Sequence, residues 1–213
     1  MITVSDRSES QASRTNGCAE PARQRSHTHT PDARCPGDDS RRILDAAVDI
    51  LRQGELLLGA VVPETYIQPV PAAFNGSIGG HYRHCLDHFS SLLRGLGAEL
   101  IDYDQRERDL RLEREPELAL ALTRQMRNAL AAISPEQLST PIWARCEVSY
   151  EHGHSPVTHS TLGRELVYAI AHGIHHYALI AVMARLMGVD VPPHFGVAPS
   201  TVNHTKTNPS PAR

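Results

Sequence analysis

Two short segments of this chain, 80–89 and 171–179, each carry three histidines in a stretch predicted to be helical. Side chains three or four positions apart share one face of a helix. Two such helices packed side by side can point three imidazoles at one metal ion. A metal site between two such helices is therefore the leading hypothesis. The histidines are His81, His84 and His88 in the first segment, and His172, His175 and His176 in the second.

The composition fits one ordered domain flanked by tails. The chain has 213 residues and is 40% hydrophobic, which is enough to bury one sizeable core. Residues 1–38 are rich in Ser, Arg, Thr, Pro and Gln, so they cannot offset the entropy lost on ordering. We expect 1–38 to be a disordered tail, 39–203 to be the folded domain and 204–213 to be a flexible tail. His27 and His29 lie in the first tail and are excluded from the site.

Charge and hydropathy exclude several classes of function. The formal net charge is -3, from 21 basic and 24 acidic residues, so no nucleic-acid partner and no anionic membrane surface is expected. The longest apolar stretch, 166–187, contains three histidines and Arg185, which indicates a core helix and not a membrane span. The cysteines lack CxxC spacing and the first residues lack the apolar core of a signal peptide, which predicts a cytoplasmic protein. A homodimer stays open.

Hydrophobic periodicity predicts four helices. In the second, apolar residues recur at alternating steps of three and four from Ile78 to Leu96, which is typical of a seam that faces a bundle. Between 139 and 159 this period fails, and apolar residues alternate with polar ones. The fold class is all-α: a four-helix bundle with a short extended or hairpin segment before the last helix. The expected helices begin near Asp39 or Ser40, after Ser77, at 116 and at Ser160 or Thr161, and end near 60, 96, 133 and 187.

The histidine phrases are similar to those of a known family. The segment 78–84, Ile-Gly-Gly-His-Tyr-Arg-His, together with a His-x-x-x-His on the last helix, resembles the DinB-like four-helix-bundle metalloproteins. The resemblance covers about 40–203. In that superfamily one histidine of the second helix and both histidines of the last bind a divalent metal, which implies the ligands His84, His172 and His176. The segments 101–106 and 195–201 look like those of an uncharacterised bacterial subgroup, and no role follows for them.

The resemblance implies a fold more firmly than a reaction. Relatives include transferases and isomerases that act with low-molecular-weight thiols, and the N-terminal domain of iron-dependent sulfoxide synthases. Three neutral imidazoles leave a divalent ion with its charge and an open position, so it can acidify bound water or a bound thiol. We expect a metal-dependent enzyme, a thiol transferase or a hydrolase, with a small-molecule substrate. The alternative is a non-catalytic metal-binding bundle with a stress-response or partner-binding role. The metal is zinc, nickel, iron or manganese.

The remaining histidines are expected to support the ligands or to lie on the surface. His172 and His176 are one turn apart, whereas His175 projects about 100° from His176, so the three cannot face one ion. Geometry allows His172 to pair with either neighbour, and the resemblance selects His176. His81 and His88 are candidates for hydrogen-bond partners of the ligands.

Three further residues are candidates from other parts of the chain. Glu165 lies two turns before His172 on a similar face, so it can orient a ligand or a water, although a solvated glutamate is the commoner role in a first helix turn. Tyr103 and Arg106 belong to the charged connection 102–109. They are candidates for substrate contacts at the end of the bundle, against the ordinary alternative of a solvated loop.

Overall fold

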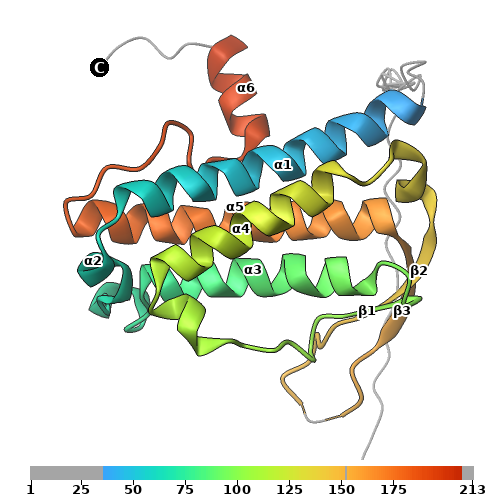
Figure 1. Ribbon diagram of the computed structural model, residues 1–213, viewed down its shortest axis with the longest axis horizontal. Coiled ribbons are helices and arrows are strands. Elements are labelled where there is room, and N and C mark those ends of the chain that lie inside the picture. The colour runs from blue at the N-terminus through green and yellow to red at the C-terminus, as the bar shows by residue number, and fades with distance from the viewer. Residues whose placement is uncertain (1–35, 152, 208–213) are drawn as a thin grey trace, which may run out of the picture. The chain divides into compact units, whose positions relative to one another are not determined.

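The computed structural model describes residues 36–151 and 153–207, so the tail expected over 1–38 lies, apart from its end, outside the described residues (Figure 1). In the described part, six α-helices and one three-stranded sheet form the fold. The four long helices are α1 (Pro36–Ala60), α3 (Ile78–Gly95), α4 (Pro116–Ala131) and α5 (Leu162–Leu186). The shorter elements are α2 (Pro63–Ile67), α6 (Pro199–Thr207), the 3-10 turns η1 (Pro71–Ala73), η2 (Leu110–Glu113) and η3 (Pro135–Ser139), and the strands β1 (Leu100–Asp102), β2 (Pro141–Arg145) and β3 (Val157–Thr161).

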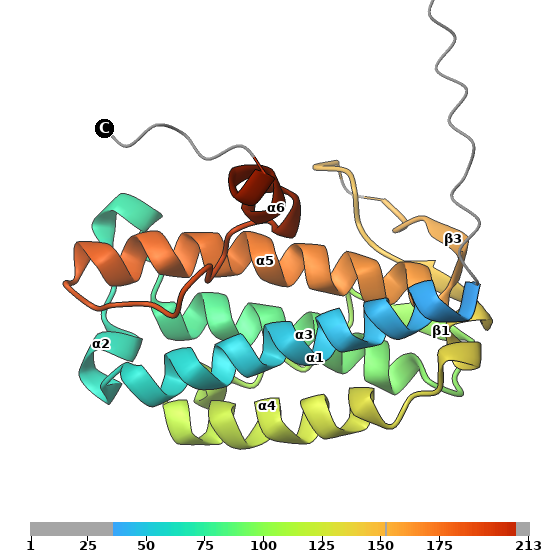
Figure 2. The same cartoon turned by 90° about the horizontal axis from the view of Figure 1, so that it is seen from above.

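The long helices pack along one another, as the two views show (Figures 1 and 2). α1 packs against α4 and α5, and α3 packs against α5 and α4. Each helix turns an apolar stripe inward, because residues three and four positions apart share one face. The buried side chains of these stripes include Leu44, Leu51, Phe89, Met126 and Leu166.

Two buried tyrosines mark the place where the four long helices meet. Tyr82 on α3 and Tyr177 on α5 stack with 6.1 Å between ring centroids. The hydroxyl groups of Tyr82 and of Thr123 on α4 are joined by a hydrogen bond of 2.9 Å. On α1, Gly54 lies against the two tyrosines, and a Cβ at that position would overlap both hydroxyl oxygens. The absence of a side chain there lets α1 pack closely at this point. Each tyrosine follows a histidine in the sequence, so this tyrosine pair also fixes how the two histidine segments face each other.

A small sheet follows the strand order β1-β2-β3, with β1 parallel to β2 and β2 antiparallel to β3. The antiparallel pair is the extended segment expected before α5. β1 is not expected from the sequence, because a strand of three residues is too short to show a period. The all-α class is therefore corrected to a mostly helical fold with a small sheet, to which the connection after α3 contributes one strand.

The helices that carry the histidines begin at predicted caps. The hydroxyl of Ser77 accepts a hydrogen bond of 3.0 Å from a backbone N–H of α3, and Thr161 does the same for α5 at 3.2 Å. α1 instead begins at Pro36, ahead of the expected cap at Asp39 or Ser40. The starts predicted for the two histidine helices are confirmed, as is the start of α4 at Pro116.

The segment 195–201 is anchored on α5. The Phe195 ring stacks on Tyr177 with 4.3 Å between centroids. Gly196 has a φ of 72° and lies so close to the backbone of Ala178 that a Cβ would overlap it. α6 follows and continues past 203, where the sequence placed the end of the folded domain.

Among the described residues, α5 has the length and mean hydropathy of a membrane-crossing helix. Its buried residues include Glu165 and Tyr177, and it contacts α1, α3 and both strands of the antiparallel pair. These contacts are those of a core helix, which agrees with the prediction from its polar residues.

Candidate metal centre

α3 and α5 bring histidines from both segments together. The Nε2 atoms of His84 and His172 lie 3.1 Å apart, although the residues are 88 positions apart in the sequence. Ligand atoms of His84, His172 and His176 all lie within 4.8 Å of one another. A zinc ion lies about 2.0–2.1 Å from a histidine nitrogen. Nitrogens that share such an ion lie at most about 4.2 Å apart, so small rotations of the side chains would bring this set around one ion. These three histidines are the ones that the resemblance implies.

His81 lies next to this set and contacts His176. Their Nδ1 atoms are 3.0 Å apart, so one of them carries the hydrogen of the bond. A histidine that binds a metal usually donates its other ring N–H to a partner. His81 is placed to accept such a bond from His176. The supporting role of His81 stays a prediction.

His88 is buried behind the set. Its ring centroid lies 3.8 Å from that of His172, and 4% of the residue is exposed. Arg106 reaches between the histidines from the connection after β1. The Arg106 Nη1 atom lies 3.0 Å from His88 Nε2 and 3.2 Å from His84 Nδ1. Arginine only donates, so both of these ring nitrogens accept.

His175 lies apart from the converging nitrogens. It is exposed, and its ring meets the His176 ring edge-on at a centroid distance of 5.2 Å. A surface position is one of the two alternatives that the sequence left open for it.

Glu165 and Tyr103 form a buried pair. The Tyr103 hydroxyl donates to Glu165 at 2.9 Å, and the Ser160 hydroxyl donates to the other carboxylate oxygen at 2.6 Å. The expected solvated glutamate is therefore buried, because a strand residue and the connection after β1 cover it. Tyr103 stacks on His88 with 5.3 Å between ring centroids. Tyr103 thereby links Glu165 to the histidine cluster.

Burial keeps the clustered imidazoles neutral at pH 7. It lowers the pKa of His84 and of His172 to about 4 each, and the nearby charge of Arg106 adds to the effect on both. It also lowers the pKa of His176 to about 3 and that of His88 to about 2. The neutral imidazole is the form that binds a metal ion. The three converging histidines are therefore in a metal-binding form.

A cavity of about 340 Å³ opens beside the histidines, and His81, His84 and His176 line it. Glu113 and Arg83 form another part of its wall, joined by a hydrogen bond from Arg83 Nε to the carboxylate at 3.1 Å.

Sequence reasoning missed this wall. A Cβ at Gly79 would overlap the backbone oxygen of Glu113, so a glycine is needed where η2 meets α3. The Gly79-Gly80 pair ahead of His81 was the available signal, because adjacent glycines in a helix indicate a close backbone approach.

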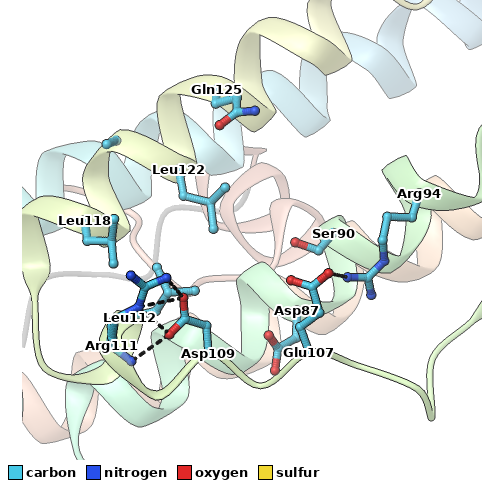
Figure 3. A pocket seen from close by; sticks show the side chains of 11 residues that line it. Asp87, Ser90, Arg94, Glu107, Asp109, Arg111, Leu112, Leu118, Leu122 and Gln125 are labelled. Carbon is cyan, nitrogen blue, oxygen red and sulfur yellow. Dashed lines mark hydrogen bonds and ion pairs between the residues drawn. The ribbon is translucent and has the colours of Figure 1, made fainter.

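A second cavity of about 340 Å³ lies between α3, η2 and α4, and Figure 3 shows its charged and apolar wall. Its carboxylates are paired with arginines, as the dashed lines mark for Arg111 and Asp109. Because these charges satisfy one another, this cavity offers less to a ligand than the histidine cluster does. The pairs are Asp87–Arg83 at 2.6 Å, Glu107–Arg94 at 3.1 Å and Asp109–Arg111 at 2.7 Å.

The family model of the DinB superfamily matches residues 38–180, and this range contains both histidine segments. The chain belongs to the DinB superfamily. The resemblance seen in the histidine phrases is thereby confirmed.

A curated relative is FK506-binding protein 5 of Rhizopus delemar, which is 34% identical over 107 residues. The matched part is 50% of this chain and 28% of the relative, so the chain spans well under half of that protein's length. No solved structure matches the chain.

Proposed function

We propose that this DinB-superfamily protein is a metal-dependent enzyme that acts with a small thiol or with an activated water. The proposal is carried by one observation: three half-buried histidines converge, and two of them, His84 and His176, line a cavity. Structural zinc sites are closed by four protein ligands, whereas catalytic sites keep a position open. Membership of the superfamily supports a divalent metal, which we take to be zinc, nickel, iron or manganese.

A divalent ion bound there would supply the positive charge that lowers the pKa of a water or thiol. The chain's own residues hold the site in order. His81 is placed to accept a hydrogen bond from a metal-bound His176 and so to fix that ring, while burial keeps His84 and His172 neutral. The cavity of about 340 Å³ is at the small end of small-molecule sites, so it fits a small substrate.

The wider setting belongs to the same proposal. We propose that the four long helices act as a DinB-like bundle in a bacterial, cytoplasmic protein with no nucleic-acid or membrane partner. The fungal relative is named for binding FK506, but the match spans 28% of it, so its name assigns no ligand to this chain.

The test uses full-length protein without a histidine tag. Metal content is measured first, and the protein is then loaded with cobalt(II), whose visible spectrum reports its ligands. Adding 2-mercaptoethanol is expected to produce a new sulfur-to-cobalt absorption band, because a thiolate can enter the open position. Ethanolamine, which lacks the sulfur, is the control.

A cobalt spectrum that thiol leaves unchanged, in protein that does bind metal, would overturn the thiol-dependent enzyme. It would leave two roles: the enzyme that uses an activated water, and the non-catalytic alternative, in which the ion joins α3 to α5 and the role lies in stress response or partner binding. His175→Ala serves as the matched variant, because it removes an imidazole from α5 outside the converging set.

A further inference from the structure

Arg106 enters the histidine cluster without an acidic partner. None of the ion pairs between described residues includes it. Its Nη1 atom contacts two histidine nitrogens, and its Nε is buried without a hydrogen-bond partner in the described structure. A guanidinium has five N–H donors and a fixed positive charge, so it is suited to binding carboxylates and phosphates. Arg106 is half-buried and has donors to spare.

The acidic residues in this region are engaged elsewhere. Asp87 pairs with Arg83 at 2.6 Å, and Asp102 pairs with Arg145 at 3.0 Å. Asp104 accepts a hydrogen bond from the backbone N–H of Glu147 at 3.0 Å, and its other oxygen does not reach Arg106. Asp87 attracts the charge of Arg106 from a distance, but no described carboxylate forms an ion pair with Arg106 next to His84.

A metal on His84 would increase the need for an acceptor at this point. In the structure His84 Nδ1 accepts from Arg106, so the neutral ring carries its hydrogen on Nε2, the atom that faces His172. A histidine that binds a metal through Nε2 carries the hydrogen on Nδ1, which then donates to a carboxylate, a carbonyl or a water. Arg106 and His84 Nδ1 would then be two donors side by side, with no described side chain between them to accept.

We propose that the metal-loaded protein binds an anionic oxygen group of its substrate, a carboxylate or a phosphate, between Arg106 and His84 Nδ1. This inference rests on the proposed function, because it needs the metal at His84. It adds a substrate class: a small molecule whose acid group is separate from the atom that meets the metal. The acid group accepts from Arg106 and from the His84 ring, and so completes the arrangement in which a ligand histidine is held by an oxygen acceptor.

The experiment is an NMR-monitored titration of full-length, zinc-loaded protein with acetate and, separately, with inorganic phosphate. The two probes distinguish a carboxylate site from a phosphate site. Arg106→Gln removes the charge under test. Arg108→Gln is the matched control, because it removes the same charge from the same connection at an exposed position. We expect Arg106→Gln to weaken binding of the preferred probe about 10- to 100-fold, the usual scale for a hydrogen bond to a charged group. We expect Arg108→Gln to change it by less than about twofold.

The zinc content of each variant is measured before the titration. A wild-type protein that binds neither zinc nor nickel, iron or manganese contradicts the proposed function. A wild-type protein that binds zinc but neither probe overturns the anion site alone. Wild-type affinity in Arg106→Gln, or equal losses in both variants, also overturns it. If Arg106→Gln does not fold, Arg106→Lys keeps the charge but loses the planar pair of donors, and its binding is expected to fall several-fold. Unchanged binding in Arg106→Lys would then refute the proposal.

Discussion

The histidine cluster and the cavity of Figure 3 both contain polar side chains of α3, but these side chains find their partners in different ways. In the cavity of Figure 3 the carboxylates lie within 3.1 Å of arginine nitrogens, so folding itself satisfies the charges. In the histidine cluster the polar atoms are ring nitrogens that burial keeps neutral, and no described carboxylate forms an ion pair with Arg106. Buried polar groups without partners are rare in folded proteins unless a ligand satisfies them. The difference therefore separates a region completed by folding from one completed by binding.

The largest expected effect is the loss of metal when a histidine of the cluster is replaced, whereas substitutions in the cavity of Figure 3 should leave the metal content unchanged. Alanine at His84, His172 or His176 should reduce bound metal from about one ion per chain to almost none, because two imidazoles hold a divalent ion too weakly. Metal analysis of the dialysed, untagged variants measures this. Asp109→Asn in the cavity and His175→Ala on α5 should keep full metal content. Full metal content in all three variants would show that these histidines are ordinary helix residues and not metal ligands.

Metal removal should be the next largest effect. An ion that binds the folded state at a thousand times its dissociation constant adds about 4 kcal/mol to the free energy of unfolding. For a domain of this size that corresponds to a melting temperature about 8–16 °C higher. Differential scanning calorimetry with and without chelator measures it, and Glu107→Gln should show the same shift as the wild type. An apoprotein as stable as the loaded protein would show that the ion does not bridge α3 and α5.

A smaller effect is expected at the histidines that support the ligands. His81→Ala and His88→Ala should weaken metal binding by at most about 10- to 100-fold, because they touch His176 and His172 without belonging to the converging set. Competition with a chromophoric chelator gives the affinities. If His81→Ala lost all metal binding and His84→Ala kept it, the metal ligand on α3 would be His81, about one turn away from His84.

The smallest effect is expected in the cavity. Glu107→Gln removes the partner of Arg94 from a pair whose glutamate side chain is 79% exposed. Solvent screening limits such pairs to about 0–1 kcal/mol of the free energy of unfolding. Urea denaturation measures the change. A loss above about 2 kcal/mol would mean that the cavity is a structural centre, and the comparison of the two regions would fail.

Much of the site was predictable because its signals are local. The spacing of His172 and His176 is a property of one helix, and so is the capping of α3 by Ser77. Periodicity also predicted the four long helices. That the two histidine segments meet needed only the packing of α3 against α5.

What could not be predicted depends on contacts between distant parts of the chain. β1 is three residues long and pairs in parallel with β2 from a later connection, so no local pattern marks it. Arg106 and Tyr103 reach the histidines only because β1 turns the connection toward α3. Glu165 looks solvated in its own helix turn and is buried because Tyr103 and Ser160 close over it.

The separation of 88 residues between His84 and His172 also has a consequence for synthesis. At about 5–20 residues per second, α3 leaves the ribosome several seconds before the ligands on α5 exist. The full set of three nitrogens forms only after α5 has docked and the two tyrosines have stacked. Metal bound at this centre would therefore mark finished molecules, and a nascent or truncated chain that ends before α5 would be unable to retain it.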